Sequence, residues 1–347
     1  MELEAIYDLI DASPLEEVLR AHPAAGEFLK NLRLTELNLD LPLCDALEAA
    51  GGDILEDFGM DAEDCADQMA EFILSMSERS EAPMAVESIT IVGGRAKDGS
   101  PEDFTLTLPC GEVVSIVGPT GSGKSRLLAD VECLAQGDTL TGRRILVNRQ
   151  KPDETTRTAL SGGLVAQLSQ NMNFVMDLSV EEFLRLHARS RQVPNVEAAI
   201  ARCYACANEL SGEKFDQSVK VTQLSGGQSR ALMIADTACM SASPIVLIDE
   251  IENAGIDRIK AVRLLMQEGK IVLISTHDPL LALNAGRRLV MKNGGIRAVL
   301  ETSETEKRAQ TTLMHVDSAL SQLRQALRSG DQIAEGVLEG LFNVDDV

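Results

Sequence analysis

The sequence predicts an α/β fold with additional helices at both ends of the chain. Three short apolar runs, Val113–Val117, Ile245–Ile248 and Ile271–Ser275, have the length and β-branched content of buried strands. Helical stretches lie between them, and this alternation is typical of a sheet covered by helices. A glycine-rich segment directly follows the first run, where a helix would begin.

The composition is that of a globular protein. Of the 347 residues, 44% are hydrophobic, 25% are charged and 3% are aromatic. This excludes wholesale disorder, and no apolar run approaches the roughly 18 residues of a membrane-spanning helix. Met1–Glu4 lacks the basic and apolar regions of a secretory signal, so we expect a cytoplasmic protein without direct membrane insertion. The seven scattered cysteines are expected to be reduced thiols.

Negative charge is concentrated in the first quarter of the chain. Residues 1–86 contain 21 Asp and Glu but only 4 Lys and Arg, whereas residues 87–347 carry a net charge of only −5. A chain with a total charge of −22 repels phosphate backbones and anionic lipids, so we expect no nucleic-acid partner. The uneven distribution also predicts that the first quarter is a separate unit.

Residues 1–84 are predicted to form an acidic helical N-terminal domain. Amphipathic spacing and end signals indicate its helices, with Ser13-Pro14 and Asp61 as start signals and Gly51-Gly52 as a stop. A linker is expected within residues 79–86. The predicted helices are Glu2–Ile10, Leu15–Ala21, a segment opened by Pro23, Leu43–Ala50 and Ala62–Ser77.

Two short strands, Ile89–Val92 and Phe104–Leu108, are expected before the first buried strand. The strand Val113–Val117 is followed by a segment that matches the phosphate-loop motif G-x-x-x-x-G-K-[ST] in full. The order of strand, glycine loop and helix is the one that this motif requires. Its glycines let backbone N–H groups surround phosphate oxygens, and the helix N-terminus adds positive charge. Lys124 would reach the β- and γ-phosphates, and Ser125 is a candidate Mg²⁺ ligand. The segment reads Gly118-Pro119-Thr120-Gly121-Ser122-Gly123-Lys124-Ser125, followed by Arg126.

Two adjacent carboxylates end the strand Ile245–Ile248. Asp249 at the strand end can hold the Mg²⁺ shell, and Glu250 can polarise an attacking water molecule. Charge pairs end many strands, but the upstream phosphate loop favours the catalytic interpretation.

A second candidate anion site is formed by Leu224-Ser225-Gly226-Gly227-Gln228, which precedes a long helical stretch. With the phosphate loop and the acid pair, this pentapeptide makes the sequence resemble the ATP-binding cassette (ABC) ATPases over about residues 88–300. The resemblance implies an ABC-type P-loop core with an inserted helical subdomain. It also implies a head-to-tail homodimer with two sandwiched ATP molecules, in which Ser225, Gly226, Gly227 and Gln228 of one protomer contact the ATP of the other.

The resemblance assigns roles to three further residues. Gln167 follows Gly163–Ala166 as in the family's glutamine loop, which implies a contact to Mg²⁺ and water. His277 lies in a segment similar to the family's switch region, so it would touch the γ-phosphate and hold the attacking water. Asp257 would be a dimer contact. The run after Glu250 is one residue longer than in transporter cassettes and looks more like the soluble members of the superfamily.

Some features leave alternatives open. Phe104 fits a core strand, so the residue that stacks on adenine stays unassigned. Cys203 and Cys206 form a lone C-x-x-C on a helical stretch, either as small residues packing a helix face or as a metal or redox pair that needs a second pair nearby or one from a dimer mate. The helical tail from Glu306 to Ser329 either covers the core or forms a short dimer or partner seam.

The sequence therefore predicts an acidic domain (1–84), a cassette domain (85–301, with a helical subdomain at about 168–235) and a helical extension (302–347). The run Leu15–Leu29 weakly resembles a small helical domain of anaerobe redox proteins. Residues 1–84 are accordingly interpreted as a docking element for an unknown protein partner, or as solvated charge with no partner.

The favoured function is a soluble Mg²⁺-dependent ATPase that remodels, assembles or activates a partner such as a metalloenzyme. The alternative is the nucleotide-binding subunit of an ABC transporter with separate membrane subunits. A role in DNA repair is disfavoured by the acidic charge.

Overall fold

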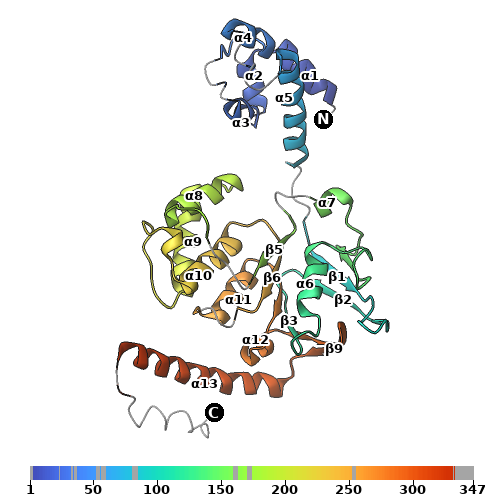
Figure 1. Ribbon diagram of the computed structural model, residues 1–347, viewed down its shortest axis with the longest axis vertical. Coiled ribbons are helices and arrows are strands. Elements are labelled where there is room, and N and C mark those ends of the chain that lie inside the picture. Colours follow the sequence, from blue (N-terminus) through green and yellow to red (C-terminus); the bar gives the residue numbers. More distant parts are fainter. Residues whose placement is uncertain are drawn as a thin grey trace. The chain divides into compact units, whose positions relative to one another are not determined.

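The chain forms two compact units, Met1–Ala85 and Val86–Val347 (Figure 1). The computed structural model describes residues 3–22, 24–32, 34, 37–51, 55, 60–79, 85–158, 163–169, 174–251, 255–330 and 332. No helix among these residues is both long enough and apolar enough to cross a bilayer.

The N-terminal unit is helical and has a core of its own. Ile6, Ile10, Val18, Met69 and Ile73 are buried together in that core. The side chain of Asp61 accepts a hydrogen bond from the N–H of Asp64 at 2.8 Å, as expected of a helix cap. The helices are α1 (Leu3–Ala12), α2 (Leu15–Ala21), α3 (Ala24–Asn31), α4 (Leu43–Ala50) and α5 (Ala62–Arg79).

Two predicted end signals of this unit have different outcomes. The residue that caps α2 is Pro14 and not Ser13, and no side chain caps this helix end. Gly51 ends α4 with φ of 107°, a conformation that glycine adopts without a Cβ penalty. Pro23 and Gly52, also predicted as end signals, lie outside the described residues.

The second unit is built on a six-stranded sheet of order β5-β6-β7-β3-β8-β9. All neighbouring pairs are parallel except β8 with β9. A smaller antiparallel sheet of order β2-β1-β4 lies beside it. The strands are β1 (Ser88–Val92), β2 (Thr105–Pro109), β3 (Val113–Val117), β4 (Arg144–Val147), β5 (Val165–Leu168), β6 (Ile245–Asp249), β7 (Ile271–Ser275), β8 (Arg287–Lys292) and β9 (Gly295–Glu301).

Both faces of the large sheet are covered, which explains why its central strands are continuous apolar runs. In β6, Ile245 and Leu247 join a core with α6 and the small sheet, whereas Val246 and Ile248 join a core with α10, α11 and α12. A separate core holds α8, α9 and α10 together (Figure 1). The helices are α6 (Lys124–Glu132), α7 (Glu154–Thr158), α8 (Val180–Ser190), α9 (Val196–Leu210), η2 (Val221–Gln223), α10 (Gly226–Cys239), α11 (Arg258–Gln267) and α12 (Pro279–Asn284).

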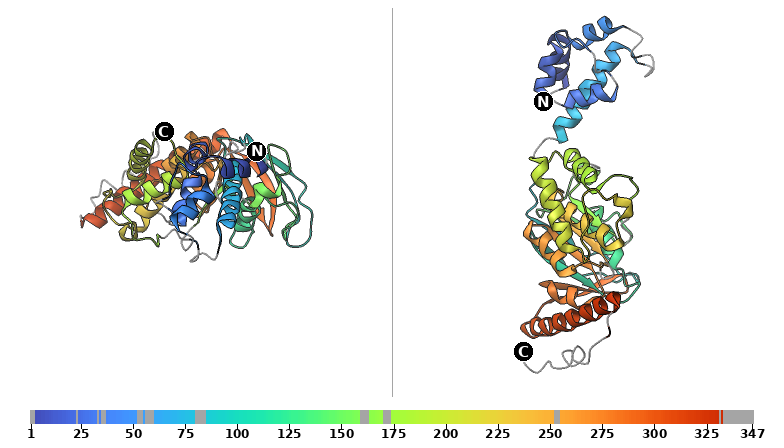
Figure 2. Two further views of the ribbon diagram at one scale, coloured as in Figure 1. Left: turned by 90° about the horizontal axis from the view of Figure 1, so that it is seen from above. Right: turned by 90° about the vertical axis from the view of Figure 1, so that its left-hand side faces the viewer.

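The C-terminal helix α13 (Glu304–Ser329) begins two residues before the predicted tail helix and lies beside α12 (Figure 2). Polar contacts anchor its first half, where Gln310 donates to Asn284 at 3.1 Å and Arg258 to Asp317 at 2.7 Å. None of its described side chains is buried, and Leu327 is 62% exposed. The helix therefore packs on the cassette without contributing to its cores, and the partner-seam interpretation stays open.

Candidate active site

The phosphate loop lies at the carboxyl end of β3, which lies between β7 and β8 in the interior of the large sheet. Gly118, Gly121 and Gly123 have φ of 153°, 77° and 105°. A Cβ on Gly118 would lie 2.5 Å from the carbonyl oxygen of Met291, and a Cβ on Gly123 would lie 2.9 Å from Cα of Gly294. Gly118 and Gly123 therefore need to be glycine both for backbone conformation and for space.

Lys124 is the first residue of α6, and its side chain is directed back into the loop. Its Nζ donates to the carbonyl oxygen of Gly118 at 2.9 Å and lies 3.0 Å from Nε2 of His277. An ammonium group only donates, so this contact is a hydrogen bond in the tautomer whose Nε2 carries no proton. Lys124 is only 6% exposed, so its charge is held close to the loop amides.

Ser125 and Asp249 form an oxygen pair at the same edge of the sheet. The Ser125 hydroxyl donates to Oδ2 of Asp249, the last residue of β6, at 3.3 Å. Hydroxyl and carboxylate oxygens are ligands that Mg²⁺ prefers, with phosphate oxygens and water completing the shell. The described residues contain no group of three His, Cys, Asp or Glu side chains arranged to hold a metal. The pair fits an ion that is held jointly by protein and nucleotide.

Glu250 adopts the left-handed conformation, with φ of 51°. Its N–H donates to the carbonyl oxygen of Ser275 on β7 at 3.0 Å, and its Oε1 lies 3.6 Å from Nε2 of His277. A non-glycine residue at positive φ costs free energy and is concentrated at functional sites. The strained turn directs the carboxylate towards His277, so the same imidazole faces both Lys124 and Glu250.

Gln167 lies on β5 and contacts a residue that no sequence pattern singled out. With its amide nitrogen facing Glu132, this nitrogen donates to the two carboxylate oxygens at 2.7 and 3.0 Å. Glu132 is the last residue of α6, the helix that starts with Lys124. The contact therefore connects the phosphate-loop helix to the strand before the helical subdomain.

Ser225 caps the N-terminus of α10. Its Oγ accepts from the N–H of Gln228 at 3.3 Å, and the Gln228 side chain accepts from the N–H of Ser225 at 2.9 Å. This capping box fixes the start of the helix and the direction of its N–H groups. A Cβ on Gly226 would meet nothing within 4 Å, so the helix start is open to a ligand or a second chain.

Asp257 lies close to this helix start. A Cβ on Gly255 would be 3.7 Å from Cα of Gly227, which brings Gly255 next to the pentapeptide Leu224–Gln228, called the signature below. Asp257 itself caps α11, accepting from the N–H of Lys260 at 3.0 Å, and forms an ion pair with that residue at 3.2 Å. The structure thus brings Asp257 and Ser225 into one region, on α11 and α10.

Two hydrogen bonds to the backbone of the phosphate loop, called the brace below, were not expected from the sequence. Lys97, in the loop after β1, donates from Nζ to the carbonyl oxygen of Gly121 at 2.8 Å. The N–H of Gly294, in the β8–β9 turn, donates to the carbonyl oxygen of Ser122, also at 2.8 Å. Two segments distant in sequence therefore fix the backbone of the loop.

The fully buried Arg143 holds this brace in place. It donates to Glu102 at 2.7 and 2.8 Å, to Asp130 at 3.0 Å and to the carbonyl oxygen of Gly294 at 2.9 Å. Burial alone raises the pKa of Glu102, but hydrogen bonds from Arg143 and from two backbone N–H groups outweigh it and leave the pKa below its usual value. The ionised pair is thus compensated inside the protein.

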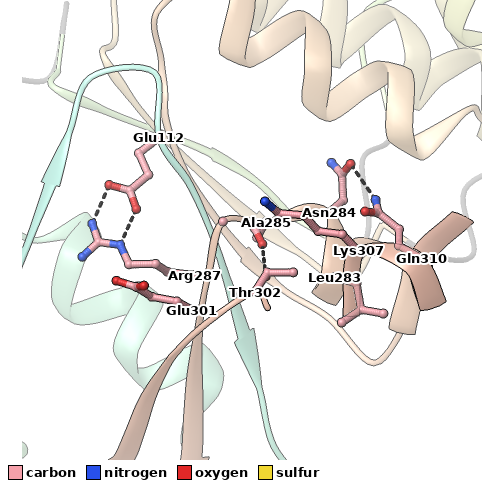
Figure 3. Close-up of a pocket in the computed structure, with 10 residues that line it drawn as sticks. Glu112, Leu283, Asn284, Ala285, Arg287, Glu301, Thr302, Lys307 and Gln310 are labelled. Carbon is pink, nitrogen blue, oxygen red and sulfur yellow. Dashed lines mark hydrogen bonds and ion pairs between the residues drawn. The ribbon is translucent and has the colours of Figure 1, made fainter. Parts of the chain in front are cut away.

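A hollow of about 420 Å³ lies near the amino ends of β3 and β8, whereas the phosphate loop follows the carboxyl end of β3 (Figure 3). Its polar side chains pair with one another. Arg287 forms a bidentate ion pair with Glu112, and the hydroxyl of Thr302 donates to the carbonyl oxygen of Ala285 at 2.6 Å. Together with the hydrogen bond from Gln310 on α13 to Asn284 on α12, these contacts connect α12, α13 and the sheet.

The comparisons with known proteins agree with this geometry. A family model described as ABC transporter matches residues 101–253. An uncharacterized ABC transporter ATP-binding protein of Methanocaldococcus jannaschii is 51% identical over 251 residues, covering 72% of this chain and 96% of that protein. The chain belongs to the ABC family. It is an ABC-type ATPase, which binds and hydrolyses ATP.

More distant relatives of this ABC ATPase are larger or share only its fold. The macrolide export ATP-binding/permease protein MacB of Aggregatibacter actinomycetemcomitans is 32% identical over 217 residues, and the match spans 32% of its length and 60% of this chain. The solved structure of cbiO1 from Clostridium perfringens, part of an ABC transporter complex, is 20% identical, with a TM-score of 0.50. That match covers 69% of this chain and 98% of the cbiO1 chain, and it shows the cassette fold.

The family assignment does not identify the residue of this ABC ATPase that contacts adenine. Phe104 packs against the core shared by α6 and the small sheet, as its place in an alternating strand predicted. Lys97 is the side chain from this region that reaches the loop, through its bond to Gly121.

Proposed function

We propose that this chain is the ATP-hydrolysing subunit of an ABC transporter whose membrane-spanning part is a separate protein. The observation that carries the proposal is the relative described as an ABC transporter ATP-binding protein, 51% identical over 96% of its own length. The other relatives named above are described as parts of export or transport systems. The comparisons give no support to the remodelling function that the sequence favoured.

The residue roles proposed here are supported by the geometry at the carboxyl edge of the sheet and, for Gln167, by its place in a segment similar to the family's glutamine loop. Lys124 and the loop amides would bind the β- and γ-phosphates, and Ser125 and Asp249 would hold Mg²⁺, with Gln167 as a further contact. A bound Mg²⁺ would neutralise charge on the phosphate oxygens. Glu250 accepts a hydrogen bond from the attacking water and draws its proton, while His277 holds the γ-phosphate. Positioning and charge stabilisation supply most of the rate in such phosphoryl transfers.

We further propose that two copies close over two ATP molecules. The capped, open start of α10 provides N–H groups and the Ser225 hydroxyl for a phosphate, which is the chemistry of an anion site. The chain has already one phosphate loop, so this second site is proposed to serve the nucleotide of the partner copy. Asp257, beside the signature, is the proposed dimer contact.

The remodelling function keeps one specific observation in its favour. Residues 1–85 form a separate unit with its own core, and they carry most of the net negative charge of the chain. A transporter subunit needs no such unit to hydrolyse ATP. An acidic helical module of this kind can dock a soluble protein.

An experiment that traps the closed, ATP-bound dimer in the host cell distinguishes the transporter function from the remodelling function. A Glu250→Gln chain should bind Mg-ATP and stay closed, and Lys124→Ala is the control that cannot close. A multi-span membrane protein that co-purifies with Glu250→Gln but not with Lys124→Ala supports the transporter subunit. A soluble enzyme recovered instead, and lost when residues 1–84 are deleted, would establish the remodelling function and reject the transporter.

A further inference from the structure

Three of the seven cysteines meet between α9 and α10. Cys203 and Cys206 lie on α9, and Cys239 is the last residue of α10. All three side chains pack in or against the core formed by α8, α9 and α10. Cys239, 33 positions after Cys206, therefore adds a single thiol to the C-x-x-C, where the sequence analysis asked for a second pair.

The three thiols differ in their exposure to solvent. Cys203 is fully buried in the core of α8, α9 and α10, whereas Cys206 and Cys239 are half-buried at its edge. A small reagent can therefore reach Cys239 and Cys206 from solvent. Cys203 faces the protein interior.

The neighbouring thiols and charged groups together favour the thiolate form of Cys239. Hydrogen bonding from Cys203, then from Cys206, and the nearby Arg202 lower the pKa of Cys239 to about 7, against the opposing effects of burial and Glu268. Burial and the neighbouring Cys239 raise the pKa of Cys206 to about 11. Arg202 is itself ion-paired with Glu268, and the ammonium of Lys270 donates to the carbonyl oxygens of Ser241 and Ser243 just after α10.

We propose that Cys239 and Cys206 form a reversible redox site that reacts with low-molecular-weight disulfides such as oxidised glutathione. Cys239 is the attacking thiolate, Cys206 is the resolving thiol, and Cys203 is a positioning donor that holds the Cys239 sulfur. An attacking thiol reacts best when its pKa is near the ambient pH, and a neighbouring thiol allows the adduct to resolve.

The reaction balances in two steps. The Cys239 thiolate attacks one sulfur of RSSR, forming a Cys239–S–S–R bond and releasing RS⁻. Cys206 then gives up its proton to RS⁻ and attacks the Cys239 sulfur, forming the Cys206–Cys239 disulfide and releasing the second RS⁻. The two protein sulfurs together lose two electrons, and one small disulfide becomes one thiol and one thiolate.

The first test compares alkylation rates in the full reduced chain. At pH 7 we expect iodoacetamide to label Cys239 about tenfold faster than Cys110 and Cys133, because its thiolate fraction is much larger. Cys110 and Cys133 are suitable internal controls, since both are exposed and burial together with nearby acidic groups raises the pKa of each. Faster labelling of either control would overturn the proposal.

The second test maps the product after incubation with oxidised glutathione and digestion without reductant. We expect a Cys206–Cys239 link that dithiothreitol reverses, that persists in Cys110→Ser and that is absent from Cys239→Ser. Cys206→Ser should stop at the glutathione adduct of Cys239. A wild-type adduct that persists without a link would refute the site, and a Cys203–Cys239 link would refute the assignment of Cys206.

Discussion

At the scale of single residues, the imidazole of His277 connects the two halves of the proposed chemistry. Its Nε2 lies 3.0 Å from the Lys124 ammonium and 3.6 Å from the Glu250 carboxylate. A phosphate bound in the loop would compete with this nitrogen for the ammonium, because both accept hydrogen bonds from it. Phosphate binding would then free the imidazole to act on the γ-phosphate.

Glu250→Gln tests the proposed role of this carboxylate. The amide keeps the size of the side chain but cannot draw a proton from water, so we expect ATP hydrolysis to fall about 10²- to 10⁴-fold. ATP affinity should change little, and a stable dimer should accumulate with Mg-ATP. Phosphate release, nucleotide binding and light scattering measure the three effects.

A matched control for this variant is Glu304→Gln, which changes an exposed carboxylate in the first turn of α13. Exposed ion pairs contribute little to stability, so this variant should hydrolyse ATP like the wild type. A Glu250→Gln chain that turns over normally would remove Glu250 from the mechanism. One that binds Mg-ATP but stays monomeric would reject the ATP-sandwich dimer.

At the scale of elements, the apolar strands were predictable, and three strands that carry charged residues were not. β3, β6 and β7 are covered on both faces, so their sequences are unbroken apolar runs that a pattern search finds. β4, β8 and β9 carry charged residues such as Arg144, Arg287 and Arg297 within the strand and expose part of it. Their strand pairing depends on neighbours far away in the sequence.

The same distinction applies to the candidate site. The phosphate loop, the acid pair and the signature were found because each is a short continuous motif. Lys97, Glu132 and Arg143 were missed because their partners lie elsewhere in the chain, as with Arg143 and the carbonyl oxygen of Gly294. Cys239 was missed for the same reason.

The β8–β9 turn is predicted to control nucleotide affinity through the brace on the phosphate loop. Gly294 has φ of 82°, and a Cβ there would lie 2.6 Å from Cγ of Lys97. Gly294→Ala should therefore shift both Lys97 and the loop, and weaken ATP binding about tenfold, or by about 1.4 kcal/mol. Titration with a fluorescent ATP analogue measures this effect.

Gly269→Ala is the control for backbone strain in the turn. Gly269 has φ of 71° but open space around its Cα, and it lies between α11 and β7. Both variants should lose stability, by roughly 1 kcal/mol each from the strained φ. Only Gly294→Ala should lose ATP affinity, and equal affinities in the two variants would contradict the brace.

At the scale of the whole molecule, the ATPase machinery and the acidic unit are separable. The proposed catalytic and nucleotide-binding residues all lie in Val86–Val347, and Met1–Ala85 has an independent core. Val86 already packs in the core of the cassette, and the thiol of Cys110 donates to its carbonyl oxygen at 2.7 Å. The boundary between the units therefore falls directly before Val86.

Deletion of residues 1–84 should leave basal ATP hydrolysis within about twofold of the full chain, because no described core residue of the cassette is removed. A matched deletion of residues 1–92 also removes β1, which pairs with both β2 and β4, and should abolish folding of the cassette. Thermal unfolding and phosphate release measure both chains. If the shorter deletion also lost activity, the acidic unit would be part of the catalytic body, and its proposed role in docking a partner would fail.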